Sequence, residues 1–163
     1  MAAAILGPAC AATGSPASPS SDNNSSAEFA AGAVPTVMSS TFAELELCAD
    51  QTNQYRVTVG LRPLRRSAIL EDFAAHAAAH DGVAHLAHDQ FMATNGAGIS
   101  SAETEILWWQ GFSVRGVIQR GLAQMWQVGP GGEHYDIMAG AYSEIGCGIA
   151  VNGSEVTVTQ DFR

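Results

Sequence analysis

The sequence predicts an α+β fold in which helices come first and a β-hairpin closes the chain. Three segments within residues 41–126 repeat apolar side chains at helical spacing. Two later strand-like segments are joined by Asn152-Gly153, a strong hairpin signal because a type I′ turn needs positive φ at both central residues. Strands and helices do not alternate in βαβ order, which argues against a nucleotide-binding sheet.

Length and charge exclude several classes of function. The chain has 163 residues, which suits one domain and a tail. It carries 7 basic residues, all Arg, against 16 acidic ones, and its net charge is −9. This balance argues against nucleic acid as a partner, because phosphate contacts need clustered Lys and Arg. No apolar run approaches the roughly 20 residues that a membrane-spanning helix requires.

The N-terminal part divides into two segments. Residues 1–10 (MAAAILGPAC) resemble a truncated export signal with a lipobox-like end, which makes Cys10 a candidate for lipidation. The alternative is an Ala-rich tail without a function. Residues 11–40 are rich in Ala, Ser and Pro and bury too little apolar surface to offset their ordering entropy, so we expect a disordered tether.

Residues 41–163 are expected to form the folded domain. The first helix begins at the capping box Thr41-Phe42-Ala43-Glu44 and ends before Gly60, which can stop a helix. The second helix follows the cap residue Ser67 and ends near Gly82.

The rest of the domain is expected to contain one more helix and three strands. The third helix begins at Ser113 and reaches Trp126. An irregular stretch precedes it, with a possible short strand over Ile106–Trp109. After a glycine-rich turn, two strands cover Glu144–Val151 and Glu155–Phe162.

Four of the five histidines lie in or just after the second helix. His76 and His80 are four residues apart and share a helix face, as in a two-His metal site. The zincin motif also needs Glu beside the first His, so a structural or surface role is favoured for this pair. His85 and His88 follow the helix, where a chain turn could direct one imidazole into a cleft.

Two further features are candidates for a site. Glu103 and Glu105 precede a Trp pair, and a solvated turn is the alternative interpretation. His134 lies on the glycine-rich turn after the third helix, and such loops carry function more often than cores do.

Two cysteines remain besides Cys10. In an exported chain, Cys48 and Cys147 suggest one disulfide that closes a long loop. A catalytic thiol at Cys147 is disfavoured, because a hairpin strand offers no obvious base or positive dipole.

Several motifs of the folded part resemble one known superfamily. They are Asn53-Gln54-Tyr55-Arg56, Gly60-Leu61, Pro63-Leu64, Trp126 and the strand Tyr142-x-x-Ile145-Gly146-Cys147-Gly148-Ile149-Ala150. Together they resemble the CAP superfamily of cysteine-rich secretory proteins, antigen 5 and plant pathogenesis-related proteins, called SCP-like in bacteria. The resemblance covers about 47–163 and implies a three-layer α-β-α sandwich with a cleft.

The resemblance also implies cavity residues. His88, Glu103 and His134 match the cavity positions, and the reserve candidates are His85, Glu105 and Glu133. The family's Gly-Glu-Asn is Ala102-Glu103-Thr104 here, and the carboxylate or Ser after the family Trp is Gly129. A set of imidazoles and carboxylates suits Zn²⁺ or another divalent cation.

These features favour an exported binding or interaction module, extracellular or held at the cell envelope. Its cleft is expected to take a divalent cation or a small or lipidic ligand, its partners being such a ligand or an envelope protein. Membrane contact would occur only through a lipid anchor. The alternative is a metal-assisted hydrolase, a protease or esterase in which Glu103 acts as base on a water held by His88 and His134. A third interpretation is that the histidine cluster is purely structural.

Overall fold

The structure, a computed structural model, describes residues 42–163. The predictions for residues 1–10, the tether 11–40, Cys10 and the cap residue Thr41 therefore lie outside the described residues. The elements in chain order are α1 (Phe42–Thr58), β1 (Arg65–Arg66), α2 (Ala68–Ala84), α3 (Asp89–Thr94), η1 (Asn95–Gly98), β2 (Ala102–Trp109), α4 (Val114–Gln127), α5 (Glu133–Met138), β3 (Glu144–Asn152) and β4 (Glu155–Phe162).

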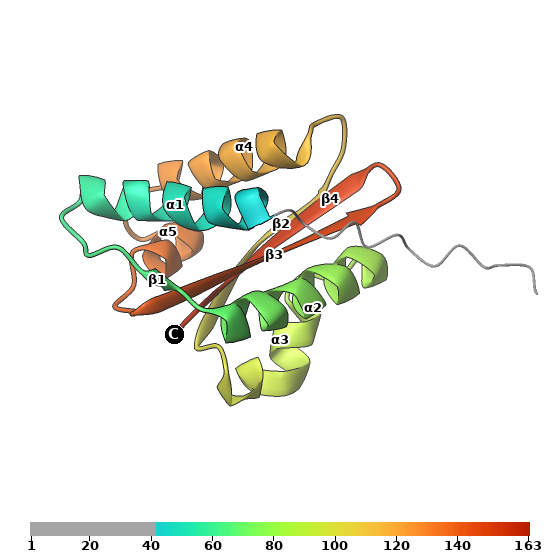
Figure 1. Ribbon diagram of the computed structural model, residues 1–163, viewed down its shortest axis with the longest axis horizontal. Coiled ribbons are helices and arrows are strands. Elements are labelled where there is room, and N and C mark those ends of the chain that lie inside the picture. Colours follow the sequence, from blue (N-terminus) through green and yellow to red (C-terminus); the bar gives the residue numbers. More distant parts are fainter. Residues whose placement is uncertain (1–41) are drawn as a thin grey trace, which may run out of the picture. The chain divides into compact units, whose positions relative to one another are not determined.

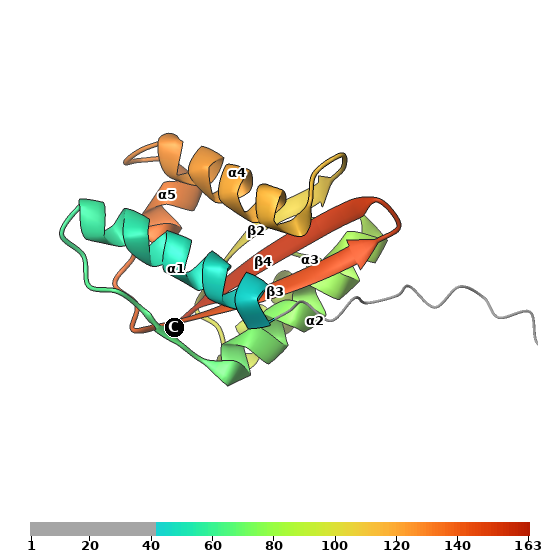
Figure 2. The same cartoon turned by 45° about the horizontal axis from the view of Figure 1, so that its top comes forward.

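The domain is an α-β-α sandwich around a mixed four-stranded sheet. The strand order is β1-β3-β4-β2, in which β1 is parallel to β3 and the other pairs are antiparallel. Helices α1, α4 and α5 cover one face of the sheet, and α2 and α3 cover the other (Figures 1 and 2). This arrangement confirms the predicted fold class.

The three predicted long helices are confirmed. Helix α1 is followed by Gly60 at φ 78°, where the left-handed conformation suits glycine. Ser113 caps α4, because its Oγ accepts a hydrogen bond from the Gly116 N–H at 3.2 Å. Helix α2 continues two residues beyond Gly82 and ends at Ala84.

The irregular connections contain more regular structure than the sequence predicts. Strand β2 begins at Ala102 rather than near Ile106, and the short helix α3 was not predicted. The expected glycine-rich turn is present, with Gly129 and Gly131 at positive φ, but it ends before His134, which lies in the short helix α5. These elements are short, so their apolar periodicity is too weak to distinguish them from loops.

The hairpin is confirmed, but its turn lies one residue later than predicted. Asn152 pairs with Glu155, so the central residues of the turn are Gly153 and Ser154. Only Gly153 has a positive φ, 61°, which fits a II′-type arrangement rather than type I′.

The Asn-x-x-Arg motif of α1 has a structural role. Asn53 exchanges two hydrogen bonds with the backbone of Leu64, at 2.9 and 2.7 Å, and so fixes the loop that follows α1. The buried Arg56 guanidinium donates to the carbonyl oxygens of Met138 and Gly140 at 2.7 and 2.9 Å. These bonds satisfy the end of α5 and hold it against α1.

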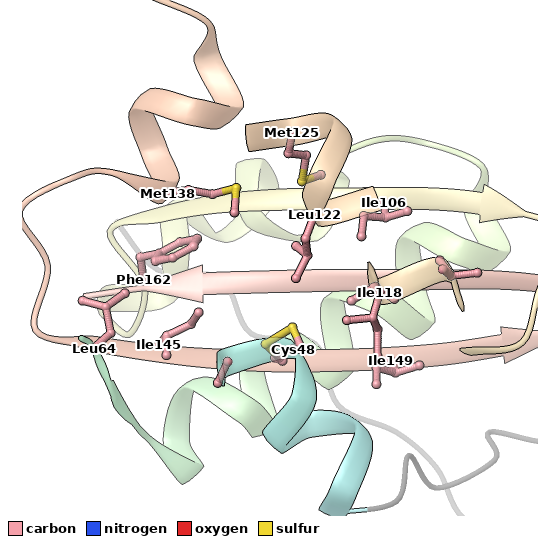
Figure 3. Packing of buried hydrophobic residues seen from close by; sticks show 14 of the residues in the cluster. Cys48, Leu64, Ile106, Ile118, Leu122, Met125, Met138, Ile145, Ile149 and Phe162 are labelled. Carbon is pink, nitrogen blue, oxygen red and sulfur yellow. A yellow bond between two sulfur atoms is a disulfide. The ribbon is translucent and has the colours of Figure 1, made fainter. Parts of the chain in front are cut away.

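The face of the sheet beneath α1 and α4 carries the apolar core (Figure 3). Cys48 and Cys147 form a disulfide there, as predicted, and it joins α1 to β3 across 99 residues. Gln160 is buried beside it and donates to Thr52 Oγ1 at 2.7 Å, while it accepts from Thr104 Oγ1 at 3.1 Å. The buried amide of Gln160 therefore has partners at both its nitrogen and its oxygen.

The opposite face brings α2 very close to the sheet. A Cβ atom at Gly146 or Gly148 would overlap the backbone of α2 at Leu70 or Ala74, so glycine is required at both positions. Strands alternate their side chains between faces, and the residues paired with this glycine row on β4 are Thr159 and Asp161. Within the part of the chain that the structure describes, no helix is long and apolar enough to cross a membrane.

Candidate functional site

The turn between α2 and α3 determines where His88 lies. His85 follows the last residue of α2 with φ 54°, and His88 precedes α3 with φ 57°. Non-glycine residues rarely adopt this left-handed conformation, so the surrounding structure must hold both of them in place. The turn directs the His88 imidazole toward Glu103 and the His85 imidazole toward Trp108.

His88 meets two carboxylates of β2. Its Nδ1 atom lies 2.9 Å from Glu103 Oε1 and 3.6 Å from Glu105 Oε2, and its backbone N–H donates to Glu105 Oε2 at 2.7 Å. Glu103 and Glu105 share a face of β2 because they are two residues apart. They are 4% and 6% exposed, so the interpretation of this segment as a solvated turn is wrong.

The three side chains form a compact group, which we call the His–Glu cluster (His88, Glu103 and Glu105). Each offers one ligand atom, and these atoms all lie within 4.8 Å of one another. Thr159 on β4 donates to Glu105 Oε1 at 3.0 Å and helps to orient that carboxylate. The His88 side chain is 35% exposed, so the cluster is reached from solvent on the imidazole side.

Burial and mutual contact shift the proton affinities of the cluster. Burial raises the pKa of Glu105 to about 7 and raises the pKa of Glu103 as well. The hydrogen bond to Glu103 raises the pKa of His88, and the nearby charge of Glu105 contributes to the same shift. Without another cation, a protonated His88 is therefore the positive partner of these carboxylates.

Two further buried acids adjoin the cluster and were missed in the sequence. Asp161 on β4 pairs with Glu103 of β2 and is 0% exposed. Asp81 on α2 is also 0% exposed, and its charge raises the pKa of both glutamates. A signal for Asp161 existed, because it continues the polar row Thr157-Thr159 on one face of β4. The pairing that places it opposite Glu103 joins distant segments and leaves no local pattern.

His134 lies apart from the His–Glu cluster. It occupies the first turn of α5, where the neighbouring Tyr135 ring packs against the Trp126 ring of α4 in a tilted contact, with 4.3 Å between the ring centroids. Together with Glu105 it lines a cavity of about 230 Å³ between β2, α4 and α5. The other lining residues are Ile106, Leu107, Trp109, Gly121, Gln124, Met125 and Val128. The reserve candidate Glu133 is exposed on the surface.

His85 does not join the cluster either. Its ring stacks on Trp108 at 5.0 Å, and its Nε2 atom lies 2.9 Å from Glu155 Oε2. Trp108 has φ 58° and lies where the register between β2 and β4 shifts, which is typical of a β-bulge. His85 and Trp108 therefore pack together beside the β3–β4 hairpin, and His85 takes no part in the His–Glu cluster.

The two remaining histidines lie on the surface of α2. His80 forms a second group with Asp81 and Asp89, whose ligand atoms also lie within 4.8 Å of one another. In this group Asp81 Oδ1 accepts from the Gln90 N–H at 3.0 Å and thereby fixes the start of α3. His76 is paired only with the exposed Asp72, at 3.9 Å.

The His–Glu cluster suits a divalent cation by its donor set. One imidazole nitrogen and two carboxylates are common ligands of Zn²⁺ and of harder cations. Glu103 Oε2 is buried and has no hydrogen-bond partner, which leaves a donor atom free. The residues present therefore fit a cation.

The α-β-α sandwich and its histidine–carboxylate cluster on the edge strand β2 define the class of fold, and sequence comparison identifies the family. The model of the cysteine-rich secretory protein family (CAP) matches residues 49–162. The chain belongs to this family. No curated protein matches the chain.

Solved structures show the same fold at low identity. The chain is similar to an outer surface protein of Borrelia burgdorferi, with 13% identity and a TM-score of 0.54, over 76% of this chain and 95% of that one. It is also similar to a cysteine-rich secretory protein of Staphylococcus aureus, with 14% identity and a TM-score of 0.50. That match covers 74% of this chain and 39% of the staphylococcal chain, so the domain spans well under half of that protein.

Proposed function

We propose that this chain is an exported, non-enzymatic binding module that holds a divalent cation in its His–Glu cluster. The observation that carries the proposal is the convergence of three ligand atoms within 4.8 Å. His88 comes from the α2–α3 turn, and Glu103 and Glu105 come from β2, so two rigid strand positions and one constrained turn support the site. A bound cation would supply positive charge and open coordination positions for a ligand or water.

Cation binding is expected to compete with protonation of His88. A cation needs the neutral imidazole and ionised carboxylates. Because contact with Glu103 raises the pKa of His88, the proton competes at higher pH than it would for a free histidine. Affinity should therefore fall as the pH is lowered below neutrality.

The cavity next to the cluster offers a place for a small or lipidic ligand. Most of its lining residues are apolar, and Gln124 and His134 supply its polar side chains. Glu105 lines the cavity with its backbone, because its side chain is 0% exposed and its carboxylate bonds Thr159 on the opposite face of β2. The cavity and the cluster are therefore two places on the two sides of the same strand. A cavity of about 230 Å³ is smaller than the roughly 300–1,000 Å³ of drug-sized sites, so it suits a small molecule or part of an acyl chain.

Export is supported by the disulfide and by the family. Disulfides form and persist in oxidising compartments outside the cytosol. Cell fractionation of the full chain tests this directly, with the expected result in the envelope or medium. A chain found in the cytosol with Cys48 and Cys147 reduced would contradict it.

Calorimetric titration with Zn²⁺ and Mn²⁺ tests the binding site. We expect one cation per chain, and affinity lowered about 10-fold or more in His88→Ala and Glu105→Gln, because each loses a ligand. His76→Ala is the matched control, since it removes an exposed histidine from α2 and should bind like the wild type. Equal affinity in His88→Ala and the wild type would remove the proposal.

The same preparations distinguish binding from turnover. Peptide and ester substrates are expected to remain uncleaved with either cation bound. Metal-dependent cleavage that disappears in His88→Ala would show a hydrolase instead.

A further inference from the structure

Asp161 has an unusual environment for a buried acid. Its side chain is 0% exposed, and neither carboxylate oxygen has a hydrogen-bond partner. The Ser100 hydroxyl is close enough to lower the pKa of Asp161, but its hydrogen bonds go to the carbonyl oxygens of Ala102 and Phe162, at 2.9 and 3.4 Å. Burying a carboxyl group without a hydrogen-bond partner is costly in either protonation state, and most costly when it is ionised, so this position needs an explanation.

The unpartnered atoms gather around the His–Glu cluster. Within residues 42–163, four buried side-chain polar atoms lack a hydrogen-bond partner: both oxygens of Asp161, Glu103 Oε2 and Asp81 Oδ2. All four are carboxylate oxygens, and each of these acids interacts electrostatically with the cluster. Chance defects of packing would instead include amides, hydroxyls and distant residues.

The sheet directs Asp161 toward Glu103. The two residues are directly paired across β2 and β4, and side chains so paired lie on the same face with Cβ atoms about 4.5–5.5 Å apart. Thr159, two residues earlier on β4, points to that face and bonds Glu105. Asp161 is not one of the three residues whose ligand atoms lie within 4.8 Å of one another, but it interacts electrostatically with all three of them.

We propose that Asp161 is a further ligand of the cation site, which makes the site rich in oxygen donors and favours a hard divalent cation of the Mn²⁺ type. This inference rests on the proposed function, because it concerns the same site. Carboxylates suit Mg²⁺, Ca²⁺ and Mn²⁺, whereas an imidazole alone suits Zn²⁺ and its neighbours. A site with three carboxylates and one imidazole therefore favours Mg²⁺, Ca²⁺ or Mn²⁺ over Zn²⁺.

The charge of the site supports the same conclusion. Glu103, Glu105 and Asp161 together offer up to three negative charges, and His88 is the one positive partner among their hydrogen bonds and ion pairs. A divalent cation would neutralise more of this charge than the imidazolium does. It would also give partners to oxygen atoms that the protein leaves free.

The test compares Mn²⁺ and Zn²⁺ affinities in Asp161→Asn. Free Mn²⁺ is followed by electron paramagnetic resonance and Zn²⁺ by calorimetry. We expect Mn²⁺ affinity to fall about 10-fold or more, and Zn²⁺ affinity by less than about 3-fold, because Zn²⁺ is already satisfied by three protein ligands. Asp72→Asn is the control, since it removes one exposed acid from α2 and should bind both cations like the wild type.

The outcomes separate this inference from the proposed function. Equal loss for both cations, or no loss for either, would overturn the role of Asp161 while His88→Ala still reports on the site itself. Wild-type protein that binds Zn²⁺ but not Mn²⁺ would overturn it as well. If Asp161→Asn does not fold, Asp161→Ser provides a smaller neutral side chain for the same comparison.

Discussion

The two faces of the sheet differ in whether their buried polar groups have hydrogen-bond partners, and two neighbouring residues of β4 show the difference. Gln160 points toward α1 and α4 and bonds Thr52 and Thr104. Asp161 points toward α2 and α3, where neither of its oxygens has a partner. We call the face beneath α1 and α4 the closed face, because its buried amide is hydrogen-bonded, and the face beneath α2 and α3 the open face, because it keeps buried carboxyl oxygens without partners. The closed face carries the disulfide and the apolar core, and the open face carries the proposed cation site.

The largest effect is expected from the disulfide on the closed face. The double variant Cys48→Ala/Cys147→Ala removes a link between residues 99 apart in sequence. It should lose about 2–5 kcal/mol of unfolding free energy, because the unfolded chain gains freedom. Urea denaturation measures this loss. A change of under about 1 kcal/mol would show that the packing of this face does not depend on the link.

A somewhat smaller effect is expected where α2 approaches the sheet. In Gly148→Ala the new Cβ would overlap the Ala74 backbone and push α2 away. The expected cost is about 1–3 kcal/mol, typical of overpacking. Thermal unfolding measures it, with Gly116→Ala near the exposed start of α4 as the control. An equal effect of the two substitutions would contradict the close approach of α2.

The satisfied amide of the closed face provides the next test. Gln160→Leu keeps a side chain of similar size but leaves Thr104 Oγ1 without its acceptor. We expect a loss of about 1–3 kcal/mol, the cost of an unpaired buried hydroxyl. Chemical denaturation at pH 7 measures the loss. A neutral or stabilising result would contradict the claim that the hydrogen bonds of Gln160 stabilise this face.

The smallest expected effect is a change in how stability depends on pH, and it concerns Asp161 on the open face. Burial raises the pKa of Asp161 from 3.8 to about 8, and the charges of Glu103 and Glu105 add to the shift. The folded protein therefore holds a proton that the unfolded chain releases, and stability is lost as the pH rises from about 4 to 8. Asp161→Asn should flatten this decline in cation-free protein by roughly 1–2 kcal/mol.

Denaturation curves between pH 5 and 8 measure that slope. Asp72→Asn is the control, because its exposed carboxylate lies outside the cluster. If the pH dependence of stability is unchanged in Asp161→Asn, the raised pKa of Asp161 is contradicted.

Much of the fold was predictable because its signals are local. Helix α4 has a clear apolar face, α1 and α2 are long and have recognisable start or stop residues, and the hairpin has Gly153 between two strand-like runs. The disulfide followed from the two cysteines that remain beside Cys10 in an exported chain. The short helices α3 and α5 were missed because six residues are too few to show a period.

The site was only partly predictable, because it depends on contacts between distant segments. The family resemblance named His88 and Glu103, and the structure brings them together with the reserve candidate Glu105. It places His134 in the neighbouring cavity instead. Asp161 was missed because its burial follows from the pairing of β4 with β2, which the sequence does not specify locally.

The most direct test of the central claim is the melting temperature of the wild type with and without a saturating divalent cation. A ligand at about 100 times its Kd adds about 2.7 kcal/mol, so we expect a rise of several degrees that is lost in His88→Ala and kept in His76→Ala. No rise in the wild type, or the same rise in His88→Ala, would contradict a cation site on the open face.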